Sequence, residues 1–138
     1  MSSLDLELRP IGRVRSSLKE RRLAPMQGIE GAPDAWIELL PEFVAGASGL
    51  VVDDELVVLT WLHQAERGVL QVHPRSDPAR PLTGVFGTRS PDRPNPIGLH
   101  RVTIRAIEGN RLRIGPIEAI DGTPVVDVKP VLAPPRMP

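Results

Sequence analysis

The segment that decides the fold is Leu56-Val57-Val58-Leu59-Thr60-Trp61-Leu62, a short apolar and β-branched run without alternation. Such a run is expected of a strand covered on both faces, so it is the best candidate for the centre of the core. Around it, apolar and polar residues alternate with a period of two, which is typical of half-buried strands. These alternating runs lie at residues 4–8, 69–72, 102–106, 112–114 and 126–128.

Turn and breaker residues separate the runs. Gly109-Asn110 and Asp121-Gly122 have turn chemistry, and Pro10 with Gly12 ends or bends the first run. Between Pro33 and Val44 there is room for a helical turn or two, because Pro41 interrupts any longer helix. About seven short strands at close spacing, with short helical turns only, predict an all-β fold, either a sandwich or a small barrel.

The 138 residues are expected to form one domain over residues 1–132, followed by a loose Pro-rich tail at 133–138. The start of the chain lacks the basic and apolar pattern of a signal peptide, and no apolar run is long enough for a membrane span. The absence of Cys excludes a disulfide scaffold, a cysteine nucleophile and a thiolate metal site. We therefore expect a soluble, cytoplasmic protein.

Charge cancels overall but is segregated along the chain. Seventeen basic residues balance seventeen acidic ones, which argues against binding nucleic acid by bulk charge. Basic residues concentrate at 9–22 and 75–105, whereas residues 30–66 contain acids and no Lys or Arg. The two basic segments either meet as one positive face or remain scattered, solvated charge. With four aromatic residues in the chain, base-stacking platforms are scarce.

Signatures of nucleotide folds, zincins and serine hydrolases are absent from the sequence. His63, His73 and His100 are too widely spaced to indicate a metal site, so a structural or surface role is favoured and no metal is expected. His63-Gln64 closes the central apolar run, where the two side chains either face solvent or line a pocket. Residues 121–130 combine a turn with a strand, and their spacing alone is typical of an ordinary hairpin.

The segment from Gly84 to Leu99 differs from the rest of the chain because three prolines stiffen it. Pro residues fix their own φ angles and push the preceding residues out of the helical region. The result is a stiff, extended loop whose donors suit a carboxylate or a phosphate at little entropic cost. The alternative is a strand connection whose arginines pair with the acidic half of the chain. The donors are Thr88, Arg89, Ser90, Arg93 and Asn95, and the prolines are Pro91, Pro94 and Pro96.

Taken together, these segments resemble the TsaA-like or TrmO family. The matching motifs occur in the family's order: residues 11–16, residues 25–28, His63-Gln64, the TRSPDRPNPIGL loop at 88–99 and DGTPVVDVKP at 121–130. The resemblance extends from about Ile11 to Leu132 and rests mainly on the last two motifs. It implies a compact β-barrel methyltransferase that binds S-adenosylmethionine near a homodimer interface. The implied acceptor is N6 of threonylcarbamoyladenosine, next to the anticodon of tRNA.

By position, the resemblance also implies a cofactor site. We hypothesise that Arg89 holds the methionyl carboxylate and that Asp121 accepts from the ammonium or a ribose hydroxyl. Leu99 and Met26 offer apolar contact to adenine. His63 is the first candidate for a catalytic base and Asp121 the second. The implied cofactor-binding residues are Pro25, Met26, Gln27, His63, Gln64, Arg89, Leu99, Ile120 and Asp121, and the implied substrate-binding residues are Arg93, Asn95 and Lys129.

The chain departs from the family's pattern at several positions. Met26 stands where Arg is common, and Asp92 stands where the loop usually has an aromatic or apolar residue, which puts a negative charge where an anionic RNA approaches. Two other functions therefore stay open: methylation of a small molecule, and a non-catalytic module that senses the cofactor. A joined positive surface beside the pocket favours tRNA, and a closed, uncharged pocket favours a small acceptor.

Overall fold

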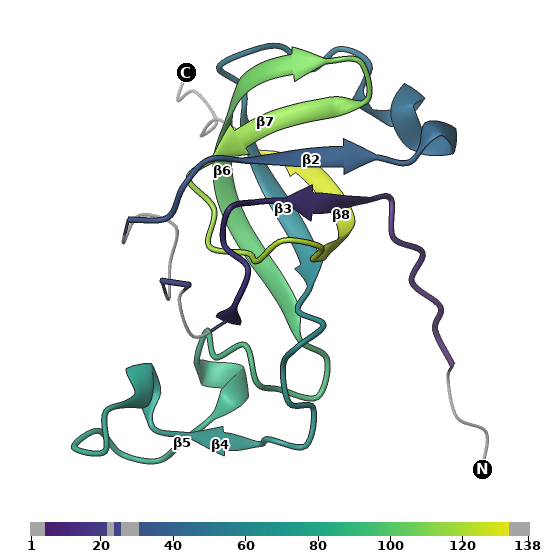
Figure 1. Ribbon diagram of the computed structural model, residues 1–138. Coiled ribbons are helices and arrows are strands. Elements are labelled where there is room, and N and C mark those ends of the chain that lie inside the picture. Colours follow the sequence, from purple (N-terminus) through teal and green to yellow (C-terminus); the bar gives the residue numbers. More distant parts are fainter. Residues whose placement is uncertain (1–4, 22–23, 26–30, 133–138) are drawn as a thin grey trace, which may run out of the picture.

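The computed structural model describes residues 5–21, 24–25 and 31–132. Within these residues, six strands close into a barrel in the order β1-β2-β7-β6-β3-β8, and β4 and β5 form a separate two-stranded sheet. Figure 1 shows the barrel above the excursion, residues 62–96, that carries β4 and β5. The strands are β1 Gly12–Arg15, β2 Ala35–Leu39, β3 Glu55–Trp61, β4 Gln71–Val72, β5 Thr83–Gly84, β6 Ile97–Glu108, β7 Arg111–Gly115 and β8 Pro124–Pro130.

The predicted all-β class, with a closed barrel and short helical turns only, is confirmed. The helical segments of the described chain are three 3₁₀ turns, at Pro41–Ala47, Pro74–Ser76 and Val85–Gly87. All barrel pairs are antiparallel. In the part of the chain that the structure describes, no helix is long and apolar enough to cross a membrane.

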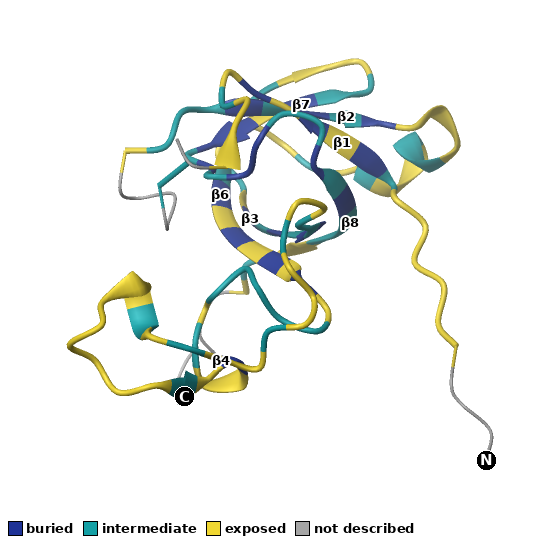
Figure 2. Cartoon of the chain, turned by 60° about the horizontal axis from the view of Figure 1, so that its bottom comes forward, coloured by how far each residue is buried: buried dark blue, intermediate teal, exposed yellow. Residues whose placement is uncertain are grey.

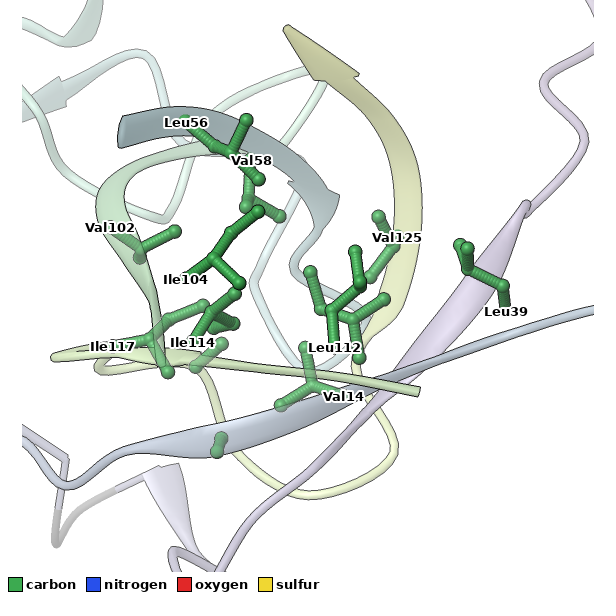
Figure 3. Packing of buried hydrophobic residues seen from close by; sticks show 13 residues of the cluster. Val14, Leu39, Leu56, Val58, Val102, Ile104, Leu112, Ile114, Ile117 and Val125 are labelled. Carbon is green, nitrogen blue, oxygen red and sulfur yellow. The ribbon is translucent and has the colours of Figure 1, made fainter. Parts of the chain in front are cut away.

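The core fills the interior of the barrel. Side chains alternate between the interior and the outer surface along most of the barrel wall, as the blue and yellow bands of β6 show in Figure 2. Figure 3 shows the inward side chains of several strands meeting in one cluster, which excludes water from the centre of the ring. The buried cluster consists of Val14, Ala35, Ile37, Leu39, Leu56, Val58, Val102, Ile104, Leu112, Ile114, Ile117, Ala119 and Val125.

The central run at 56–62 forms β3 but is not covered equally on both faces, so that prediction was wrong. Leu56, Val58 and Thr60 are buried, whereas the alternate residues are only half-buried. A barrel wall has one interior face, and the outer face of β3 has no second layer of strands to cover it. The apolar outer residues instead lie close to the surface.

The first alternating run does not form a strand. Residues 5–10 have no regular secondary structure, Leu6 and Leu8 are 85% and 51% exposed, and Leu4 lies outside the described residues. The period of two predicted a half-buried strand. The closed ring leaves this segment no free edge, because β1 already pairs with β2 on one side and β8 on the other.

The segment from Pro33 to Val44 contains the start of a helical turn, as predicted, and also a strand that was not predicted. Ala35, Ile37 and Leu39 alternate into the core and form β2. Pro41 then starts a 3₁₀ turn rather than interrupting a helix, since its missing N–H is not needed at a first helical position.

The Asp121-Gly122 turn is confirmed, but the hairpin suggested by its spacing is not formed. β8 pairs with β1 and β3 instead of β7, and the turn bonds to the end of β1. A bulge between β3 and β8 also changes which valines point inward: Val125 is fully buried, whereas Val126 is only half-buried. The expected pairing of Val126 with Val128 on one face is therefore wrong.

The run at 69–72 contributes only β4, which lies outside the barrel. Its Leu70 is 63% exposed, so this run does not reach the core. The predicted turn at Gly109-Asn110 is confirmed and joins β6 to β7. The predicted half-buried run at 112–114 is also confirmed, because Leu112 and Ile114 are buried in β7.

Candidate functional site

An open groove lies where the stiff loop returns from the excursion to the barrel. The loop passes through the 3₁₀ turn Val85–Gly87 and enters β6 at Ile97. The groove brings Arg89 and Leu99 together, as the resemblance implied. Exposed apolar side chains line it beside the arginines, so it offers both charge and apolar surface to a ligand. The lining residues are Phe86, Gly87, Thr88, Arg89, Arg93, Ile97 and Leu99.

Of the two arginines in this groove, Arg89 is the one without a partner among the described residues. It is exposed, and it makes no hydrogen bond or ion pair within the described part of the chain. Its planar guanidinium therefore has its full set of donors available to a carboxylate or phosphate.

Arg93 has a different surrounding, because its donors are used inside the loop. Nη1 donates to the carbonyl oxygens of Thr88 at 3.0 Å and Ser90 at 3.1 Å, and Nη2 donates to that of Val85 at 2.6 Å. These bonds fold residues 85–90 around one guanidinium. Arg93 thus shapes the loop that presents Arg89, and its predicted contact with substrate stays a prediction.

Asp92 ties the loop to two other segments. Its Oδ2 accepts from Arg21 Nη2 at 2.8 Å, and its Oδ1 accepts from the backbone N–H of Glu66 at 2.9 Å. Arg21 Nη1 also reaches the carbonyl oxygen of Gln64 at 3.4 Å. Burial acts to raise the pKa of Asp92, but the hydrogen bonds from Arg21 and Glu66 and the Arg21 charge outweigh burial and lower the pKa below 3.8.

His63 and Gln64 lie on the turn that follows β3, and both are exposed. The turn is held to the loop because Leu62 N–H donates to the carbonyl oxygen of Pro96 at 2.8 Å. The sequence left open whether these two side chains face solvent or line a pocket. In the structure they face solvent, on a turn that adjoins the loop lining the groove.

Asn95 and Lys129, the other predicted substrate-binding residues, both have partners. Asn95 Oδ1 accepts from Arg67 Nη2 at 3.1 Å, and Lys129 Nζ lies 3.5 Å from Asp127 Oδ2. Lys129 is on β8 and pairs with Val57, two residues along β3 from Leu59, which pairs with Leu99. It therefore lies on the same outer surface as the groove.

Asp121 binds the start of segment 16–21, which follows β1 and whose other end, Arg21, binds Asp92. Its Oδ1 accepts from the backbone N–H of Ser16 at 3.0 Å, and its Oδ2 lies 3.2 Å from Lys19 Nζ. The Ser16 hydrogen bond is the main reason why the pKa of Asp121 is lowered, with Lys19 adding to it against the effect of burial. The neighbouring Ile120 is buried at 8% exposure.

Segment 16–21 is therefore fastened at both ends, to Asp121 near β1 and to Asp92 on the loop. Figure 1 shows this part of the chain descending from β1 towards the excursion. Pro25 follows it and is half-buried, and the predicted Met26 and Gln27 lie outside the described residues. The structure thus connects the loop, the His63-Gln64 turn and the Asp121 turn through shared hydrogen bonds.

Sequence reasoning missed a buried polar chain below the groove. Thr60 Oγ1 and His100 Nε2 are 2.7 Å apart, and His100 Nδ1 is 2.6 Å from Glu118 Oε1. Gly98 makes room for this chain, because a Cβ at that position would collide with Thr60 Oγ1 and lie 2.7 Å from His100 Nε2. The structural role favoured for His100 is what the structure shows, and no group of three or more potential metal-ligating side chains occurs among the described residues.

The fold and this site together define a class: a small antiparallel barrel that presents an unpartnered arginine and apolar side chains on an open groove. The sequence pattern of the tRNA-methyltransferase O N-terminal domain matches residues 13–134, which is most of the chain. The chain belongs to this family, and the resemblance drawn from the motifs is confirmed.

Similar proteins cover the same region. A probable S-adenosyl-L-methionine-binding protein of Methanothermobacter thermautotrophicus is 44% identical over 94% of this chain and 93% of its own length. A second protein with that description, from Pyrococcus horikoshii, is 45% identical over 78% of this chain and 80% of its own length. The crystal structure of TrmO from Pseudomonas aeruginosa aligns with a TM-score of 0.73 at 33% identity, over 94% of this chain. This chain spans 57% of that TrmO chain.

We predict that Asp92 contributes stability that acid removes. Because its pKa is lowered in the folded state, the contribution is present above pH 3.8 and is lost as the pH falls through the folded-state pKa. In Asp92→Asn the free energy of unfolding is expected to be lower at neutral pH and to fall less on acidification. Urea unfolding at a series of pH values measures both changes. Asp77→Asn is the control for the loss of one negative charge, and identical acid curves for Asp92→Asn and the wild type would contradict the prediction.

Proposed function

We propose that this chain binds S-adenosylmethionine and catalyses transfer of its methyl group. The observation that carries the proposal is the unpartnered Arg89, held at the groove by a loop that is itself braced by Arg93 and Asp92. A cation that is positioned without being neutralised favours an anionic group of a ligand. Family membership and the descriptions of the relatives support S-adenosylmethionine as that ligand.

The residues at the site have the chemistry that this cofactor requires. Arg89 suits the carboxylate of the methionyl part, and Asp121, kept ionised by its lowered pKa, suits the ammonium or a ribose hydroxyl. Leu99 is 46% exposed in the groove and offers apolar contact to adenine. We retain the other predicted cofactor contacts as part of the proposal, namely Pro25, Met26, Gln27, His63, Gln64 and Ile120.

When bound, S-adenosylmethionine supplies a methyl group that is activated towards nucleophiles by its sulfonium. The chain's own residues then act mainly by holding the cofactor and the acceptor in line, which is where most of the acceleration is expected. A nitrogen acceptor must also lose a proton. His63 is the proposed base because its imidazole is exposed beside the loop. Asp121 is a weaker base, since a lowered pKa reduces proton affinity.

The proposed acceptor is N6 of threonylcarbamoyladenosine in tRNA, and the proposed location is the cytoplasm. The family is described as that of tRNA-methyltransferase O, which supports tRNA over a small molecule. Arg93, Asn95 and Lys129 remain the proposed contacts to this substrate, with Arg93 acting through the shape of the loop. Cofactor binding without transfer to any acceptor would instead support the sensor module.

We also propose a homodimer with the cofactor site near its interface. Phe86, Ile97 and Leu99 support it, because they leave apolar surface exposed around the groove at 81%, 43% and 46%. A second copy would cover that surface and enclose the ligand. Light scattering of the purified protein is expected to give twice the chain mass of 15.1 kDa, and a strictly monomeric mass would contradict the dimer.

We predict that Arg89→Ala weakens S-adenosylmethionine binding by about 10- to 100-fold, the loss expected when hydrogen bonds to a charged group are removed. Titration calorimetry measures the dissociation constants. Arg80→Ala is the matched control, because Arg80 is an exposed arginine of the same excursion that pairs with Asp77. Equal affinities for Arg89→Ala and the wild type would refute the assignment of Arg89. Absence of binding by the wild type would refute the proposed function itself.

We predict that His63→Gln lowers the rate of methyl transfer at saturating cofactor by about 100-fold or more, the usual contribution of a general base. Single-turnover assays measure the rate with labelled cofactor and tRNA that carries threonylcarbamoyladenosine without the N6-methyl group. Retained turnover would mean that His63 only shapes the pocket.

A further inference from the structure

Two rows of outward-facing side chains cross one side of the barrel, from β1 through β2 and β7 to β6. Because the strands are paired in register, the members of each row are direct neighbours about 4.8 Å apart. Arginines occupy the β1 and β7 positions of both rows. The rows are Arg15, Trp36, Arg113 and Ala106, and Arg13, Glu38, Arg111 and Glu108. We call Arg13, Arg15, Trp36, Arg111 and Arg113 the arginine face.

Carboxylates offset only part of the charge of the four arginines: Glu38 and Glu108 stand in the second row, and Asp34 lies beside Arg113. Arg13 and Arg111 form no ion pair with a carboxylate in the described chain. Arg15 and Arg113 have carboxylate partners at 3.8 Å and 3.6 Å, with side chains that are about half exposed. Exposed pairs of this length contribute little, so phosphate groups can replace them at small cost. The positive charge is therefore available to an anionic partner although the whole chain is neutral.

Trp36 gives the face an aromatic ring among these charges. The Arg111 guanidinium lies 4.3 Å from the ring centroid, and Arg111 Nε is buried without a hydrogen-bond partner. Arg15 and Arg113 flank the ring on the neighbouring strands. A half-exposed aromatic ring with stacked and flanking arginines is a surface on which an unpaired base can stack while its phosphates contact the cations.

The face adjoins the turn that contains Asp121, one of the proposed cofactor contacts. Arg13 Nη1 donates to the carbonyl oxygen of Gly122 at 3.0 Å, and β1 continues directly into Ser16, which binds Asp121. A single nucleic-acid strand bound across the face would therefore run towards the Asp121 turn.

We propose that the arginine face binds a single-stranded segment of RNA and guides the acceptor base to the methyl-transfer site. This inference rests on the proposed function and adds a binding surface to it. Phosphates contact the four arginines, and one unstacked base of the segment packs against Trp36.

The proposal is tested with an anticodon stem-loop RNA, whose binding is measured by fluorescence anisotropy over a range of salt concentrations. Arg15→Gln/Arg113→Gln is expected to weaken binding at least tenfold and to reduce the slope of log K against log salt by about 1.4, which corresponds to two phosphate contacts on a single strand. Trp36→Leu is expected to weaken binding about 5- to 100-fold without changing the slope. Arg75→Gln/Arg80→Gln, which removes two arginines from the excursion, is the matched control. Melting temperatures and S-adenosylmethionine titrations accompany each variant.

Retained cofactor binding and a selective loss of RNA affinity in the face variants would support the proposal. An equal loss in the control pair, or equal affinity of the wild type for poly-glutamate, would overturn it in favour of non-specific attraction to anions. Loss of cofactor binding in the face variants would also overturn it, because the substitutions would then act on the site. Absence of RNA binding by a wild type that binds S-adenosylmethionine would overturn the RNA surface and leave the cofactor proposal standing.

Discussion

Closure of the barrel through β1 is the constraint on which the rest of the structure depends. β1 pairs along its length with β2 but meets β8 at only two positions, Gly12 with Val125 and Arg13 with Pro124. The close approach to β2 requires Gly12, since a Cβ there would collide with the carbonyl oxygen of Glu38. Closure leaves Val14 without any exposed surface and brings the Asp121 turn against the end of β1. The ring therefore builds the core and positions the Asp121 turn in the same step.

The other side of the site depends on polar contacts around the excursion. Asp92 joins the loop to Arg21 and to the backbone after β3, while Arg93 holds the loop from inside. Asp92 was expected to oppose an approaching RNA. Its charge is instead compensated locally by Arg21, which is possible because segment 16–21 crosses to the loop. A departure from the family's usual residue thus serves to fasten the site in this chain.

The core below the groove contains a polar chain that also depends on a glycine. Thr60, His100 and Glu118 form two short hydrogen bonds, and Gly98 leaves the room that the first bond requires. Buried polar groups stabilise a fold only when they are paired, so this chain fixes how β6 lies against β3. Ile97 and Leu99, which line the groove, flank Gly98 on that strand. The position of the groove is therefore set from within the barrel.

The sequence by itself determined the all-β class, the turns at 109–110 and 121–122, the stiff loop and the family, because these follow from local periodicity, turn chemistry and motif order. It misjudged residues 4–8 and 126–128, because local patterns do not reveal whether a strand edge is free or where a bulge shifts the inward face. It also missed the strand Ala35–Leu39. Only the tertiary structure decided that Arg89 has no partner among the described residues, whereas Arg93 and Asn95 are engaged. The structure alone also showed that arginines from β1 and β7 share one face. The physical reason is that such pairings join residues far apart in the chain, and only closure of the ring brings them within bonding distance.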